Sequence, residues 1–215
     1  MDMLQNLERL DLLIAHYVSG SLPEPAHVLV GSHLEMQPSA EKLVGVLERY
    51  AGDALQAIPP VPLSDRERLL AEIFASAPPP EPRARIFEKS RFPASLRAYV
   101  GTDLADIGWK MKLPGLRHHV IEKSEDVETS LLWVRPGRAL PQHSHHGLEL
   151  TLVLGGEFHD HRGNFGEGDV SVADEMLDHR PIAGKREPCL CFCVLFAPIA
   201  LSGSTLRLLG DIIGL

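Results

Sequence analysis

The sequence of 215 residues lacks several features that would place it in a special class of protein. It has only 3 cysteines, 6% aromatic residues and no apolar run of about 18 residues, the length that a membrane-spanning helix needs. An odd number of cysteines, all lying between Cys189 and Cys193, excludes a disulfide framework. The first 13 residues carry acids where a secretory signal has a basic head. We therefore expect a reduced, cytoplasmic protein.

Positive charge is also scarce, because 21 lysines and arginines face 29 acidic residues and the formal net charge is −8. Such a chain repels phosphate, so direct binding to nucleic acid is not expected. Hydrophobic residues make up 44% and charged residues 23%, which is ordinary for a globular protein. Histidine and proline are abundant, with 11 and 17 residues, and their positions carry most of the information.

The first 76 residues show the periodicity of helices. Apolar residues recur at three- and four-residue spacing over 3–18, and Gly20 is placed to end that helix. A second helix is expected from Leu22 to about Gln37, and a third follows with Ser39 as its N-cap. The pattern Ser64-Asp-Arg-Glu67 is typical of a capping box and predicts a short fourth helix to about residue 75.

The chain changes character after these helices. The run Ala77-Pro-Pro-Pro-Glu-Pro82 suits neither a helix nor a central strand, and it predicts a linker over 77–94. From there the apolar pattern alternates, with strands expected over 131–134, 148–154, 169–173 and 190–196. We therefore predict an α+β protein of two domains: a helical domain over 1–76 and an all-β domain, a sandwich or small barrel, over 95–215.

The segment His143-Ser-His145-His-Gly-Leu-Glu149 is the strongest chemical signal. In a strand, His143, His145 and Glu149 share one face, and inward-pointing polar groups are costly unless they are coordinated. Two imidazoles and a carboxylate are ligands for one divalent metal, with zinc the first choice and iron, manganese or nickel the others. His179, after a short acidic turn, is the expected fourth ligand. A solvated histidine-rich loop is the alternative interpretation.

Other polar residues of this half receive structural interpretations. We interpret His159-Asp-His161 as a polar loop, with a second metal site as the alternative. His118 and His119 precede a strand and show no partner pattern. Residues Cys189 to Cys193 alternate on a strand and suit core packing. Their alternative role, as a redox sensor, requires an exposed thiolate.

Several of these residues resemble the motifs of a known protein family. Gly137, His143-Ser-His145, Glu149 and Gly156 fit the spacing of the first cupin motif. The downstream half is similar to the cupin-like domain of ChrR-type anti-sigma factors. The segments Asp11-Leu-Leu-Ile-Ala15 and Gly20-Ser-Leu-Pro-Glu24 resemble the N-terminal anti-sigma domain of the same family. The resemblance implies that the β domain is a cupin, a jelly-roll barrel.

The resemblance also implies a function. Members of the family sequester an extracytoplasmic-function sigma factor through their helical domain, and the metal-binding cupin domain senses a stress signal, an oxidant or a small molecule. Residues 1–57 hold eight acids and three bases, which suits a basic partner. No membrane partner is expected, and the sequence permits a homodimer. The alternative function is that of a metal-dependent cupin enzyme, such as a dioxygenase or an isomerase.

The sequence departs from the family at the N-terminal zinc motif, which consists of a histidine, two cysteines and an upstream ligand. His33 matches the motif's histidine, whereas we place Met36 and Ser39 at the cysteine positions and Glu8, or else His16, at the upstream position. A soft zinc site needs thiolates, and this half has no cysteine. We therefore expect no N-terminal zinc, and His33 to be a surface residue or a hydrogen-bonded core residue.

Overall fold

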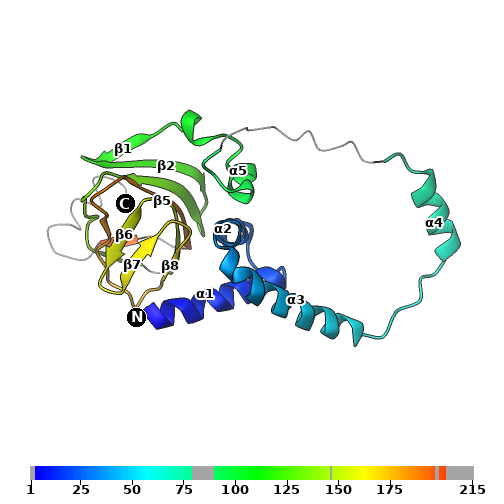
Figure 1. Ribbon diagram of the computed structural model, residues 1–215. Coiled ribbons are helices and arrows are strands. Elements are labelled where there is room, and N and C mark those ends of the chain that lie inside the picture. The colour runs from blue at the N-terminus through cyan, green and yellow to red at the C-terminus, as the bar shows by residue number, and fades with distance from the viewer. Residues whose placement is uncertain (1–2, 79–89, 146, 197–198, 202–215) are drawn as a thin grey trace.

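A computed structural model describes residues 3–78, 90–145, 147–196 and 199–201. Figure 1 shows the strands gathered into one rounded body, with α1, α2 and α5 beside it and α4 standing well away from it. The α-helices of the described residues are α1 (Met3–Val18), α2 (Glu24–Met36), α3 (Glu41–Gln56), α4 (Arg66–Ala75) and α5 (Ala94–Val100). None of them combines the length and the apolar composition needed to cross a membrane.

The four predicted helices are confirmed as α1 to α4, whereas the two predicted caps are wrong. Helix α1 stops as expected at Gly20, whose φ of +68° is readily adopted by a residue without a side chain. Ser39 lies inside a short 3-10 helix (η1, Pro38–Ala40) and does not cap α3. The N-cap of α4 is Asp65, whose side chain makes no capping hydrogen bond, so the capping box does not form.

Helix α5 was not predicted, because seven residues are too few to show a helical period. Its start is held by α2: the Glu35 carboxylate accepts hydrogen bonds from the backbone N–H groups of Ala94 and Ser95, at 2.5 and 2.9 Å. A second 3-10 helix (η2, Leu104–Asp106) leads into the first strand. Most of the predicted linker, residues 79–89, lies outside the described residues.

The β domain is built from antiparallel strands in three sheets. The main sheet has the order β1-β2-β3-β10-β5-β8, a second pairs β11 with β4, and a third has the order β7-β6-β9. The strands are β1 (Lys110–Leu113), β2 (Leu116–Lys123), β3 (Glu128–Val134), β4 (His143–His145), β5 (Leu148–Gly155), β6 (Glu157–Asp160), β7 (Gly163–Gly166), β8 (Val170–Ala173), β9 (Ile182–Ala183), β10 (Cys189–Phe196) and β11 (Ile199–Leu201). The four predicted strands are confirmed as parts of β3, β5, β8 and β10. The protein is therefore the expected α+β chain of a helical region followed by a barrel-like β domain.

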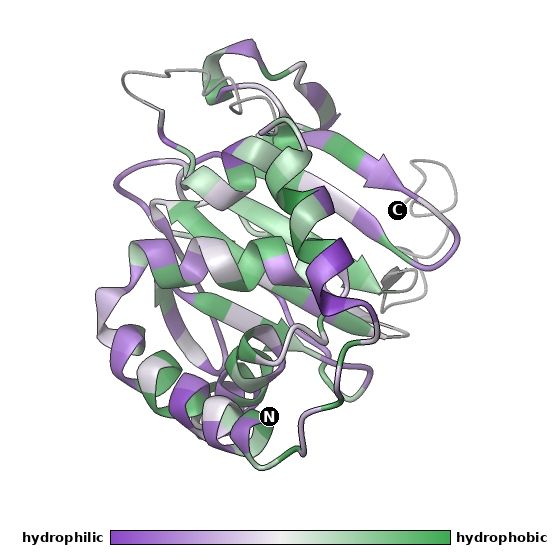
Figure 2. Cartoon of the chain, turned by 90° about the vertical axis from the view of Figure 1, so that its right-hand side faces the viewer, coloured by the Kyte–Doolittle hydropathy of each residue, from purple (hydrophilic) through white to green (hydrophobic). Residues whose placement is uncertain are grey.

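The main sheet is apolar on both faces, and each face has its own core. Even-numbered residues of β5 and β10, such as Leu152 and Phe192, pack against Ile14 of α1 and Leu29 of α2. Odd-numbered residues such as Val153 face the interior of the barrel. In Figure 2 the strands are largely green, while the helices alternate between green and purple as their buried and exposed sides change. Strand parity thus decides which residues reach the barrel interior.

Candidate metal centre

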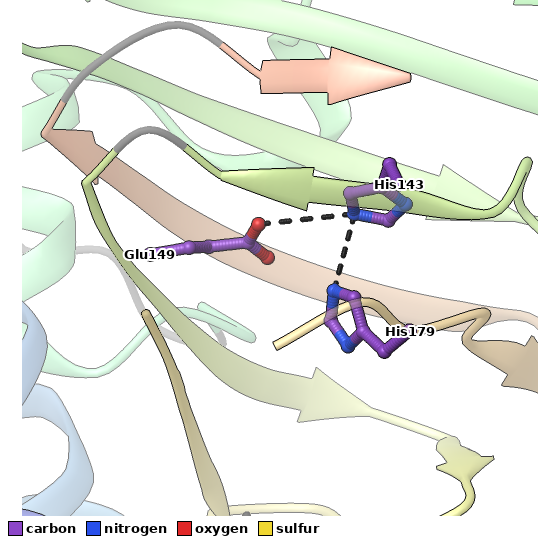
Figure 3. Close-up of side chains that lie close together, drawn as sticks. All are labelled: His143, Glu149 and His179. Atoms are coloured by element: carbon purple, nitrogen blue, oxygen red, sulfur yellow. Dashed lines mark hydrogen bonds and ion pairs between the residues drawn. The ribbon is translucent and has the colours of Figure 1, made fainter. Parts of the chain in front are cut away.

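Three polar side chains from three separate segments of the chain meet inside the barrel. His143 begins β4, Glu149 lies on β5, and His179 lies in the segment between β8 and β9. The backbones of His143 and His179 exchange two hydrogen bonds of 3.0 Å, which fix the two imidazoles relative to each other. Figure 3 shows the two rings facing one another through their nitrogen atoms, with the carboxylate of Glu149 beside His143.

The donor atoms are close enough to share one ion. His143 Nε2 lies 3.2 Å from His179 Nε2 and 3.9 Å from Glu149 Oε2. The three ligand atoms all lie within 4.8 Å of one another. Two imidazole nitrogens bound to one zinc at about 2.0–2.1 Å are separated by about 3.3 Å when the ligands are tetrahedral. The observed separation of the two nitrogens therefore fits two ligands of one ion.

The protonation of the two rings supports this interpretation. His143 Nδ1 lies 2.8 Å from the Pro141 carbonyl oxygen, and His179 Nδ1 lies 3.1 Å from Asp160 Oδ2. Both oxygens can only accept, so each Nδ1 carries the proton and each Nε2 of a neutral ring presents a lone pair. Two lone pairs that face each other at 3.2 Å repel, and either a cation between them or a proton on one of the nitrogens relieves the repulsion. Donation from the second ring nitrogen is also the usual arrangement around a metal-binding histidine.

Asp160 and Arg162, which hold His179 in place, are functional residues that the sequence did not reveal. The fully buried Asp160 carboxylate accepts hydrogen bonds from Arg162 Nη2 at 2.7 Å and from His179 Nδ1. Burial by itself raises the pKa of Asp160, but the hydrogen bonds from His179 and Arg162 outweigh it and hold the pKa well below its usual range. The polar-loop interpretation of 159–161 was wrong for His159 and Asp160, since both lie in β6.

The remaining predicted ligand, His145, lies on β4 two residues after His143, and its backbone pairs with Ile199 of β11. The side chain of His145 lies outside what the structure describes, so its role as a ligand stays a prediction. His179 occupies the predicted place after β8.

A hollow of about 90 Å³ lies beside His143 and Glu149 and opens toward the outside of the barrel. Its apolar lining residues are Leu116, Leu132, Leu140, Pro141 and Leu195, and its polar ones are Lys112, His118, Glu128 and Ser130. His118 was wrongly placed before a strand, since it lies within β2, 3.7 Å from Glu128. Burial and the nearby Lys112 lower the pKa of His118 to about 4, so the ring is neutral at pH 7. The hollow therefore offers a mainly apolar approach to the centre.

The three cysteines line the inner wall below the histidines. All are buried, and the sulfur atoms of Cys189 and Cys191 are 3.5 Å apart. A hydrogen bond with Cys189 and burial raise the pKa of Cys191, and burial raises that of Cys193. Their prediction as core residues is confirmed, and none is the exposed thiolate that a redox sensor needs.

In the helical region, His33 is a buried, hydrogen-bonded core residue, one of its two predicted roles. Its Nδ1 donates to the carbonyl oxygen of Gly168, 2.7 Å away. The family motif, His-X3-Cys-X2-Cys, when counted from His33 falls on Gln37 and Ala40, so the assignment of Met36 and Ser39 was one residue too early. Gln37 Nε2 donates to the carbonyl oxygen of Glu167 at 3.1 Å. The side chains of His33 and Gln37 thus bind the β domain.

Two residues were considered for the upstream ligand position, His16 and Glu8. His16 is exposed on α1, and its Nδ1 lies 2.8 Å from Ser21 Oγ. The side chain of Glu8 lies outside the described residues.

The fold and the paired histidines define the β domain as a cupin, and residues 97–197 match the family model described as the ChrR cupin-like domain. The anti-sigma-E factor ChrR of Cereibacter sphaeroides is 34% identical over 191 residues, which cover 88% of this chain and 89% of that relative. The chain therefore belongs to the ChrR family of anti-sigma factors. The crystal structure of Rhodobacter sphaeroides SigE in complex with the anti-sigma ChrR superposes with a TM-score of 0.74, at 34% identity, and the match covers 86% of this chain and 96% of that chain.

Proposed function

We propose that this protein is an anti-sigma factor of the cytoplasm. Its helical region binds an extracytoplasmic-function sigma factor and keeps it from RNA polymerase, and its cupin domain senses a stress signal or a small molecule. The family relationship supports this function, since the matching crystal structure is that of ChrR in complex with SigE.

The observation that carries the proposal is an exposed apolar surface on α3, α4 and the segment between them. Phe74 and Ile73 of α4 are 83% and 64% exposed. The other exposed apolar residues of this surface are Val46, Tyr50, Leu55, Ile58, Val61 and Leu63. Apolar surface of this extent on a soluble protein marks a site for a protein partner.

Helix α4 in particular requires a partner. It has 10 residues, none of them buried, and it is held by local ion pairs such as Arg68–Glu72, at 2.5 Å. An isolated helix shorter than about 12–15 residues is only marginally stable in water. Packing of Phe74 and Ile73 against a sigma factor supplies the stabilisation that the described residues of this chain do not provide.

We test this function by capturing the tagged full chain from its native host and identifying a bound sigma factor by mass spectrometry. The affinity of the purified pair is then measured by calorimetry. Phe74→Asp places a charge in the interface and weakens binding at least about tenfold, as expected for a central aromatic residue.

The matched control is Met111→Asp. Met111 is 75% exposed on β1, in the cupin domain, and this variant binds like the wild type. Equal affinity of the Phe74→Asp variant and the wild type, or capture of no sigma factor at all, contradicts the proposal.

For the cupin domain we propose one divalent metal, zinc in the first place, held by His143, His145, Glu149 and His179. Support comes from the two facing Nε2 atoms and from the carboxylate beside them. When bound, the ion supplies a positive charge that ties β4, β5 and the segment after β8 together. Pro141 and Asp160 keep the two rings in the tautomer that binds it. A signal molecule would approach through the apolar hollow beside His143 and Glu149.

A further inference from the structure

Strand β8 is the last strand of the main sheet, and a side chain of the helical region seals its outer edge. Asn6 of α1 donates from Nδ2 to the carbonyl oxygen of Val170, at 3.0 Å. Its Oδ1 accepts from the N–H group of Val172, at 2.7 Å. Asn6 is only 2% exposed. Its amide therefore replaces the peptide group of a further strand, and without it two buried backbone groups would have no partner there.

Val172 of β8, which donates to Asn6, is also bonded to a residue that supports the metal centre. The carbonyl oxygen of Val172 accepts a hydrogen bond from Arg162 Nη1, at 3.0 Å. Arg162 also holds Asp160, which in turn accepts the proton of His179 Nδ1. On its inner edge β8 pairs with β5, where Ala173 lies opposite Glu149. Strand β8 thus contacts both α1 and the residues that support His179 along its outer edge, and it contacts the strand of Glu149 along its inner edge.

Further polar contacts between the helical region and the cupin domain lie on both sides of this bond pair. Arg9 of α1 forms an ion pair of 2.5 Å with Asp174, directly after β8. His33 and Gln37 of α2 bind the carbonyl oxygens of Gly168 and Glu167, in the turn before β8. The helical region therefore holds both ends and the middle of one short strand.

We propose that Asn6 is a positioning residue of the metal centre, so that docking of α1 on β8 and binding of an ion by His143, Glu149 and His179 stabilise each other. This inference rests on the metal site proposed above. Both events order β8, and each makes the other less costly in conformational entropy. Because coupling between two sites is reciprocal, a change at Asn6 that abolishes docking lowers metal affinity by the factor by which the metal strengthens docking.

The consequence for regulation is direct. Loss of the ion loosens His179 and Asp160, then Arg162 and the outer edge of β8, and so frees α1. Helix α1 also packs on α3, which carries part of the exposed apolar surface. An event at the centre of the barrel thereby reaches the surface proposed for the sigma factor.

The test uses the full chain and zinc as the probe, with affinity measured by competition against a chromogenic chelator. Replacing residues that support a metal ligand weakens binding about 10–100-fold, and since Asn6 acts one step further out we expect about fivefold for Asn6→Ala. Hydrogen exchange of the wild type provides a second measurement that needs no variant. Added zinc should slow exchange in α1.

The matched control is Gln37→Ala, which removes a contact between the domains that has no bond to Val172 or Arg162. We expect its zinc affinity to stay within about twofold of the wild type. Unchanged affinity in Asn6→Ala, equal losses in both variants, or exchange of α1 that does not respond to zinc would each overturn the coupling. If the wild type itself binds no zinc, the metal site fails, and the coupling fails with it.

Discussion

The residues around the candidate centre divide into those that would touch an ion and those that fix their protonation. Asp160 belongs to the second group, because its carboxylate holds the proton of His179 on Nδ1 and leaves Nε2 available. Pro141 does the same for His143 through its carbonyl oxygen. The ligand property of each imidazole therefore depends on a residue that does not face the ion.

A substitution at Asp160 tests this division. In Asp160→Asn the amide can donate toward Nδ1 and favours the wrong tautomer, so we expect zinc affinity to fall about 10–100-fold. The measurement is competition with a chelator on the full chain, with a thermal melt to verify folding. Asp169→Asn is the control, since Asp169 accepts a hydrogen bond from the Gly166 N–H group in a turn and contacts neither histidine. Equal affinities of the two variants would contradict the role of Asp160.

The sequence was informative for residues whose positions follow from a strand. Parity within β5 assigns Glu149 to the barrel interior, whereas His143 lies on a separate strand, β4, and was predicted from its spacing to Glu149 as a metal ligand. Asp160 and Arg162 could not be predicted, because their roles depend on a hairpin that brings β6 beside a segment 19 residues further along the chain. Their sequence neighbours His159 and His161, which are the more conspicuous candidates for metal ligands, are both exposed.

Among the elements, the apolar pattern more than length decided what the sequence revealed, since the polar β2 has 8 residues and was not predicted, whereas the apolar β8 has 4 and was. Strands β5 and β10 have 8 residues each and show a clear apolar pattern, whereas β4 and β9 have 3 and 2 residues and show none. Such short strands exist only because a neighbouring strand supplies their hydrogen bonds. The same holds for α5, whose first turn is held by Glu35 of α2.

The turn between β7 and β8 permits a prediction at this scale. Gly168 has a φ of +86°, and a Cβ atom there would lie 2.6 Å from Gln37 Nε2. We expect Gly168→Ala to lower the free energy of unfolding by about 1–2 kcal/mol, from the left-handed backbone alone, and by more if Gln37 cannot move. Urea denaturation measures the loss, and adding Gln37→Ala should recover only the steric part.

Gly45→Ala in α3 is the control for that experiment. No atom lies within 4 Å of its Cβ position, and alanine favours a helix over glycine, so the variant should be as stable as the wild type or more so. A Gly168→Ala variant as stable as the wild type would show that the turn is not held against α2.

For the whole molecule, the uneven distribution of contacts is the main feature. Helices α1, α2 and α5 share a core with the main sheet, while α4 has no buried residue. Stability is therefore concentrated in the cupin domain and the helices docked on it, and local opening should be easiest around α4.

Limited proteolysis measures this difference. Trypsin should cut the free chain at Arg66 and Arg68 well before it cuts at Arg117, which is also exposed but lies in a strand paired on both sides. In the complex with a sigma factor, the sites in α4 should be protected. Early cutting at Arg117, or unchanged cutting at α4 in the complex, would contradict this picture.

The bonds between Asn6 and β8 also impose an order of events during synthesis. Their partners are separated by 164 and 166 positions in the chain, so the ribosome makes the asparagine near the start and the strand edge near the end. At about 5–20 residues per second, roughly 8–33 seconds pass between the two. During that interval the first helix of the nascent chain cannot dock on its own β domain. A partner that binds the helices in this period meets them before the β domain on which they dock has been made.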